Sequence, residues 1–193
     1  MLLIGTVVCG QAEKQQNPYP PGLSLIIPHL TLGQSSSVNA RQPQSSPVAE
    51  VLRPALQKIK NSTAPILLPS NLPASVNVKE IHLVDGEVKS DGWEISLYYK
   101  EGCGNACFVG FFQAKRGEKV DRDEADKVVR LANGVRGYYT ARSCGGSCTP
   151  PQISWLYKGV LFTVQFNVNN KTGRQNEAEI IGLANSAIRG GPR

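Results

Sequence analysis

The segment 152–168 constrains the fold more than any other part of the sequence. Strand-like residues run from Ile153 to Tyr157 and from Val160 to Val168, and only the dipeptide Lys158-Gly159 separates the two runs. In the second run, large apolar residues alternate with threonine, glutamine and asparagine, so one side of this strand is expected to be buried and the other exposed. A two-residue connection is typical of a β-hairpin. The sequence therefore predicts an antiparallel sheet.

Further strands are expected upstream of this hairpin. Their ranges are 77–84, 93–100, 107–115, 127–131 and 135–142. Turn dipeptides lie between several of them, namely Asp85-Gly86, Asp91-Gly92 and Asn133-Gly134. Strands joined by such short turns argue against parallel βαβ units.

Two helices are expected to flank the sheet. Apolar residues recur at helical spacing over 48–61, where Pro54 either kinks the helix or marks its true start. A second amphipathic helix closes the chain, with Asn176 and Glu179 as a start resembling a capping box. The predicted fold class is α+β, with an antiparallel sheet of about six to eight strands, one helix before it and one after it.

The first twelve residues resemble the end of a secretory signal. They are short, apolar and uncharged until Glu13, and a small-x-small cleavage pattern follows the apolar run. The basic leader of such a signal is absent, so we interpret 1–12 as a truncated signal segment. Cys9 offers a second interpretation, a lipid anchor, and a buried strand of a cytosolic protein is a third. The run is too short to span a membrane, which takes about 20 residues.

The next segment, 13–46, is predicted to be a disordered tether. It is rich in Pro, Ser and Gln and carries few charges, so it cannot bury enough apolar surface to offset the entropy lost on ordering. The ordered α+β domain is then expected over 47–190. A signal, a tether and a domain together predict an exported protein of the periplasm or cell envelope.

Four cysteines occur in two CxxxC elements, Cys103–Cys107 and Cys144–Cys148. We expect structural disulfides, because exported domains meet oxidising conditions and the enclosed glycines permit tight loops. Two bridges within the loops are the first choice, and bridges between the loops are the second. A zinc site of four thiolates is the alternative, although its usual spacing is CxxC. A catalytic dithiol is less favoured, because neither element lies at a predicted helix start.

Other chemistry finds little support in the sequence. The two histidines, His29 and His82, lie far apart in the chain, and no nucleophile-elbow or phosphate-binding motif is present. The formal charge is +6, but no basic run exceeds two residues, which argues against nucleic-acid binding. We therefore expect no enzyme activity, no metal and no cofactor.

The aromatic residues make a binding surface the main functional hypothesis. Each of the pairs Tyr98-Tyr99 and Tyr138-Tyr139 must place one ring on each face of a strand. We predict that Tyr98 and Tyr139 share an exposed face near the cysteine loops and bind a ligand, a glycan or a peptide. The competing interpretation is cross-strand aromatic packing that only shields the sheet.

Several segments carry a family resemblance. They are the run PILLPSNLP at 65–73, the Cys-Gly-Asn-Ala-Cys element at 103–107, Trp155 with Gly159 and Phe162, and the run Ala-Asn-Ser-Ala-Ile at 184–188. Over 48–188 the chain resembles a group of uncharacterised exported proteins, mostly cyanobacterial, and its ending resembles envelope domains of unknown function in other bacteria. The resemblance implies a location outside the cytoplasm and offers no catalytic residue.

The expected function is thus a non-enzymatic exported protein that binds an envelope partner or a ligand through an aromatic sheet face. The alternative is a zinc-stabilised domain or a metal-dependent enzyme that uses the two CxxxC elements. A purely structural, stress-related role is the third interpretation.

Overall fold

A computed structural model describes residues 48–193, except 103, 146 and 169–171, and these residues belong to one compact unit that spans 41–193. The side chain of residue 105 is also outside the description. The predicted signal segment, the predicted tether and Cys9 therefore lie outside the described residues.

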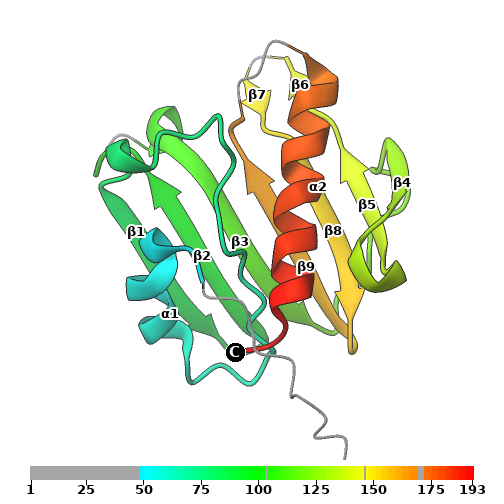
Figure 1. The fold of residues 1–193 in the computed structure, drawn as a ribbon, viewed down its shortest axis with the longest axis horizontal. Coiled ribbons are helices and arrows are strands. Elements are labelled where there is room, and N and C mark those ends of the chain that lie inside the picture. The colour runs from blue at the N-terminus through cyan, green and yellow to red at the C-terminus, as the bar shows by residue number, and fades with distance from the viewer. Residues whose placement is uncertain (1–47, 103, 146, 169–171) are drawn as a thin grey trace, which may run out of the picture. The chain divides into compact units, whose positions relative to one another are not determined.

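Seven antiparallel strands form the main sheet of the described chain, in the order β1-β2-β3-β9-β8-β5-β4 (Figure 1). Their bounds are Leu83–Lys89 (β1), Gly92–Tyr98 (β2), Phe108–Arg116 (β3), Lys127–Arg130 (β4), Arg136–Thr140 (β5), Gln152–Tyr157 (β8) and Val160–Phe166 (β9). Two short strands, Ser143–Cys144 (β6) and Cys148–Thr149 (β7), form a separate ribbon. The predicted antiparallel sheet is confirmed.

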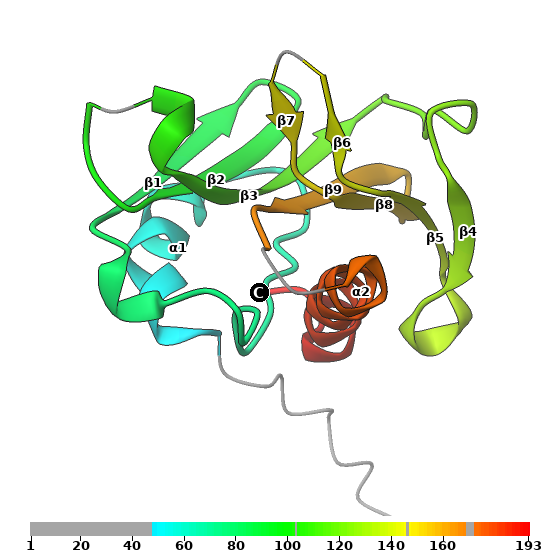
Figure 2. The ribbon, with the colours of Figure 1, turned by 90° about the horizontal axis from the view of Figure 1, so that it is seen from above.

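The two α-helices of the described residues lie on the same side of this sheet (Figure 2). The short helix α1, Arg53–Ile59, follows the 3-10 turn η1, Glu50–Leu52, and packs on β1. The long helix α2, Gly173–Gly190, packs on β8 and β9. Three further 3-10 turns are η2 (Val78–Glu80), η3 (Gly104–Cys107) and η4 (Ala132–Gly134). One helix before the sheet and one after it were expected, and both are present.

The helix starts follow from local chemistry. Pro54 occupies the first turn of α1, where its missing N–H is not needed, so it marks the true start of that helix. In α2 the N-cap is Thr172, whose hydroxyl accepts a hydrogen bond from the backbone N–H of Gln175 at 3.2 Å. The predicted start at Asn176 and Glu179 is therefore wrong, because the pattern Thr-x-x-Gln caps the helix one turn earlier.

The core lies between the sheet and the helices. In the sheet register, Trp93 pairs with Ala114, Ala114 with Phe162, and Phe162 with Trp155, and all four residues are buried. The Phe162 ring stacks on Trp155 with centroids 5.5 Å apart and meets Trp93 edge-on at 6.3 Å. From α2, the chain adds Ile180, Leu183, Ala184, Ala187 and Ile188 to this core.

The boundary of β1 differs from the sequence prediction. A strand was expected over 77–84 with a turn at Asp85-Gly86, whereas β1 runs through both residues. Gly86 serves close packing instead, because a Cβ atom at this position would lie 2.8 Å from the backbone oxygen of Ala55 in α1. The expected hairpin at Lys158-Gly159 is confirmed, with φ values of 50° and 75° that suit a tight turn between antiparallel strands.

Candidate functional site

The face of the sheet opposite the helices, here called the open face, is polar with inserted aromatic rings. Two rows of cross-strand neighbours define it. The first row is Glu94, Gln113, Thr163, Ser154 and Tyr138, and the second is Ser96, Phe111, Gln165, Gln152 and Thr140. All ten side chains are partly exposed. Most of them carry a neutral hydroxyl or amide group.

Two segments rise from the sheet on this side. The β6–β7 ribbon projects away from the helices (Figure 2). The loop between β3 and β4 contributes residues 118–121, 124 and 125 to a hollow over the open face. Together the ribbon and the loop convert a flat sheet surface into a set of recesses.

The largest of three recesses described here on the open face has a volume of about 550 Å³ and lies beside the ribbon. Its lining consists of Glu94, Ser96, Tyr98, Phe108, Phe111, Arg142, Ser147, Cys148, Thr149, Pro150, Gln165 and Asn167. Three of these residues form an aromatic cluster, in which Phe108 lies 5.9 Å from Tyr98 and 6.2 Å from Phe111 between ring centroids. The Arg142 guanidinium donates to Asn167 Oδ1 at 3.4 Å and connects the ribbon side to β9.

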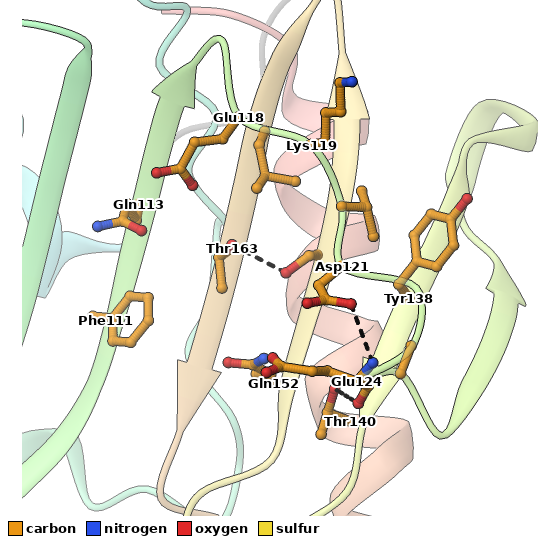
Figure 3. A pocket seen from close by; sticks show the side chains of 14 residues that line it. Phe111, Gln113, Glu118, Lys119, Asp121, Glu124, Tyr138, Thr140, Gln152 and Thr163 are labelled. Atoms are coloured by element: carbon orange, nitrogen blue, oxygen red, sulfur yellow. Dashed lines mark hydrogen bonds between the residues drawn. The ribbon is translucent and has the colours of Figure 1, made fainter.

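A second recess, of about 270 Å³, lies under the β3–β4 loop (Figure 3). Hydrogen bonds attach this loop to β5. The Thr140 hydroxyl donates to the Glu124 backbone oxygen at 3.2 Å, and the Ala141 N–H donates to an Asp126 carboxylate oxygen at 2.7 Å. The Asp121 carboxylate accepts from the Glu124 N–H within the loop at 3.3 Å. The wall of this recess is thus held in place by contacts from the sheet.

A third recess, of about 230 Å³, lies toward β1 and shares Glu94, Ser96 and Tyr98 with the largest one. Phe111 lines both the largest recess and the one under the loop. The three recesses therefore adjoin, and together they are called the open-face groove. Phe111 and Tyr98 lie at its two internal junctions.

The charge of Glu94 in this groove is balanced by its neighbours. Its carboxylate accepts hydrogen bonds from Lys89 Nζ at 2.8 Å, Gln113 Nε2 at 2.8 Å and Ser96 Oγ at 3.1 Å. Burial raises the pKa of Glu94, but the hydrogen bond and charge of Lys89, with the bonds from Ser96 and Gln113, hold the pKa below its usual value. Glu94 is therefore an ionised acceptor that orders the side chains around it.

The two tyrosines proposed from the sequence lie on opposite faces of the sheet. Tyr98 is partly exposed and lines the open-face groove. Tyr139 is only 4% exposed and belongs to the core on the helix side. Burial raises the pKa of Tyr139, and the negative charges of Glu177 and Asp126 raise it further. The prediction that Tyr98 and Tyr139 share an exposed surface is therefore wrong. The tyrosine of the pair Tyr138-Tyr139 that lies on the open face is Tyr138.

The cysteines are partly accounted for. Cys144 and Cys148 form a disulfide across the β6–β7 ribbon, which confirms the predicted bridge within that loop. Cys107 is also disulfide-bonded, whereas Cys103 lies outside the described residues. Across the described part of the chain, no group of three or more His, Cys, Asp or Glu side chains is arranged to hold a metal ion.

Sequence reasoning missed several groove residues, Phe111 above all. It lies in the range 107–115, which was expected to form a strand, but every residue from Phe108 to Phe112 is apolar or glycine, so no outward side chain stood out. The register provides the missing information, because Phe111 pairs with Gln165, and Gln165 lies on the side of β9 that alternation predicts to be polar. The same register would have assigned Tyr138, the partner of Ser154, to the open face.

No family model matches the chain, and searches among curated proteins and among solved structures also find no match. In 48–193, apart from the five positions left out, none of the helices has the length and hydrophobicity that a membrane span needs.

Proposed function

We propose that this protein is a non-enzymatic, exported binding protein of the periplasm or cell envelope, and that it binds a carbohydrate chain in the open-face groove. One observation carries the proposal: adjoining recesses combine aromatic rings with neutral hydroxyl and amide groups on a sheet face that no helix of the described residues covers (Figure 2). The partner is thus a glycan, free or attached to another envelope component.

The chemistry of the groove suits such a ligand. A sugar ring has an apolar face that packs on aromatic side chains and a rim of hydroxyls that both donate and accept hydrogen bonds. Tyr98, Phe108 and Phe111 supply the rings. Gln165 and Asn167, which line the same recess, supply amide groups that donate and accept. A few placed polar groups among apolar ones are the usual composition of a ligand site.

Support for a location outside the cytoplasm comes from the β6–β7 ribbon. Its Cys144–Cys148 disulfide is formed between exposed residues. Reducing compartments keep such thiols in the reduced state, whereas oxidising compartments preserve the disulfide.

The same disulfide bears on the alternative of a four-thiolate zinc site. Such a site requires Cys144 and Cys148 as free thiolates, and here both sulfur atoms are bonded to each other. The state of Glu94 also favours binding over acid-base chemistry. Burial raises the pKa of Glu94, but the hydrogen bond and charge of Lys89 outweigh this effect and keep the pKa below its usual value. A general acid, by contrast, needs a raised pKa.

The test is a titration of the purified domain, with its disulfides intact, against defined oligosaccharides of glucose, N-acetylglucosamine and mannose. Saturation-transfer NMR and calorimetry measure binding. For the sugar that binds, we expect Phe111→Ala to weaken affinity by roughly tenfold or more, because it removes an aromatic contact at a junction of two recesses. Tyr98→Ala is expected to weaken it as well.

Two matched controls separate the groove from general surface effects. Leu156→Ala removes an exposed apolar side chain, 47% accessible, from the same sheet face outside the three recesses. Tyr139→Phe changes the tyrosine on the opposite face. Both variants are expected to bind like the unmodified protein. Absence of binding to every sugar, or equal losses from Phe111→Ala and Leu156→Ala, would refute the proposal.

A further inference from the structure

The strand β4 is the last strand of the sheet, and its outer edge has no strand partner among the described residues (Figure 1). The Leu131 N–H donates to the Val135 carbonyl oxygen at 2.8 Å, so this pair is a bonded position of the hairpin. Bonded pairs recur at every second residue of an antiparallel ladder. The backbone N–H and C=O groups of Val128 and Arg130 therefore point away from β5, toward the free edge.

Two arginines flank this edge. Arg130 and Arg136 are direct cross-strand partners, so their side chains project from the same face of the sheet. Like charges in this arrangement repel each other. Both residues are exposed, and within the described chain neither guanidinium forms an ion pair with a carboxylate. By contrast, Lys127 on the same strand is paired with Glu177 at 2.7 Å.

Both arginines line a surface recess of about 400 Å³. Val128, Val129 and Val135 line it together with Gly134. Val128 is 58% exposed, which makes it the most exposed large apolar side chain in the described part of the chain. The unpaired backbone groups of an edge strand can pair with another chain, and the short, charged β4 limits which chains can do so.

The edge is also held in position. The Ala132 N–H, in the turn that connects β4 to β5, donates to Asn185 Oδ1 of α2 at 2.6 Å. The ion pair between Lys127 and Glu177 attaches the other end of β4 to the same helix. A preorganised edge loses less conformational freedom when it binds.

We propose that the β4 edge binds an extended acidic segment of a partner protein by strand addition. The segment pairs its backbone with the outward groups of Val128 and Arg130, and its carboxylates form ion pairs with Arg130 and Arg136. The positive charge of the two arginines identifies the partner segment as acidic, because acidic side chains are complementary to it. The first 47 residues of this chain contain a single acidic residue, Glu13, so they do not match that requirement.

The experiment titrates the ¹⁵N-labelled domain with a ten-residue peptide of alternating glutamate and threonine. We expect the amide signals of β4, those of Val128 and Arg130 included, to shift and their hydrogen exchange to slow. Two comparison peptides define the mode of binding. Replacing each glutamate by lysine removes the charge match, and N-methylation of alternate amides removes the backbone pairing; each change is expected to abolish the shifts.

The protein variant for this test is R130Q/R136Q, which is expected to weaken peptide binding by roughly tenfold or more. Its matched control, R174Q/R189Q, removes two exposed arginines from α2 and is expected to change affinity by less than about twofold. The Phe111→Ala variant is expected to bind the peptide normally. Failure of the glycan proposal for the groove can therefore be told apart from failure of the strand-addition proposal for the β4 edge.

Three outcomes would overturn the proposal. The first is equal affinity of R130Q/R136Q and the control variant. The second is full binding of the N-methylated peptide, because strand addition requires the blocked amides. The third is self-association that depends on Arg130 and Arg136 without peptide, as measured by light scattering, since the occupant would then be a second copy of the chain.

Discussion

The two faces of the sheet are built from the same strands but are stabilised by different interactions. On the helix side, Phe162 is 1% exposed and contacts both tryptophans. The next residue, Thr163, faces the other way and shares a hydrogen bond of 3.0 Å with Ser154. The helix side is stabilised by close packing of buried rings, whereas the open face combines hydrogen bonds among polar side chains with partly exposed aromatic rings.

This difference separates stability from recognition. Substitutions on the helix side remove buried contacts and leave cavities, so their cost is large. Substitutions on the open face remove interactions that water can partly replace, so they alter the groove at little cost to folding. A binding surface can therefore change while the core stays fixed.

The largest expected difference comes from adjacent residues of β9. Phe162→Ala should lower the free energy of unfolding by about 3–5 kcal/mol, because it deletes a ring stacked within the core. Thr163→Ala should cost about 1 kcal/mol, the value of one partly exposed hydrogen bond. Urea denaturation measures both. Similar costs for the two variants would contradict the proposed division between the faces.

Gly86→Ala tests the contact of the sheet with α1. The added methyl group would meet the Ala55 backbone oxygen at 2.8 Å, and backbone atoms cannot move aside cheaply. We expect a loss of about 1–3 kcal/mol in the free energy of unfolding. Gly182→Ala is the control, since a Cβ atom there meets no atom within 4 Å. That change should add up to about 1 kcal/mol through helix propensity, and thermal denaturation would reveal the opposite signs.

The two buried tryptophans provide a finer comparison within the helix side. Trp93 Nε1 donates to the Pro65 carbonyl oxygen at 3.0 Å, whereas Trp155 Nε1 is buried without a partner in the described chain. Trp93→Phe should therefore cost about 1 kcal/mol more than Trp155→Phe in urea denaturation. Equal costs would mean that the indole hydrogen bond adds nothing to stability.

The smallest effect expected is electrostatic and lies on the open face. Because the pKa of Glu94 is lower in the folded chain than its usual value, its ion pair stabilises the fold above about pH 4.3, the ordinary glutamate pKa. This contribution is lost as the pH falls through the lower, folded-state pKa. Glu94→Gln should cost at most about 1 kcal/mol at pH 7 and nothing at low pH. A cost that did not shrink with acidification would exclude the ion pair as its source.

Much of the fold was predictable because its signals are local. The alternation in 160–168, the turn at Lys158-Gly159 and the flanking helices each depend on residues close in sequence. The face assignment of Tyr139 was not predictable in this way. It depends on the pairing of β5 with β8, where Tyr139 is opposite the buried Ile153. A shift of one residue in that register would exchange Tyr138 and Tyr139 between the faces.

The groove and the cap of α2 show two other limits. The open-face groove combines residues from β1, β2, β3, β5, β8 and β9 with a loop and a ribbon, and no short motif encodes that assembly. The cap at Thr172 was encoded locally as Thr-x-x-Gln, but the similar pair Asn176 and Glu179 one turn later obscured it. Instead of capping, Glu179 accepts a hydrogen bond from the Ser75 backbone N–H at 3.2 Å.

The position of β9 between β3 and β8 determines the order in which the chain can assemble. The meander β1-β2-β3 can form from neighbouring residues, but the inner edge of β3 stays unpaired until residues 160–166 join it. Pairings between residues so distant in sequence form slowly. During folding the partly formed sheet therefore exposes a long hydrogen-bonding edge, and the last fifth of the chain both covers that edge and supplies the helix that closes the core.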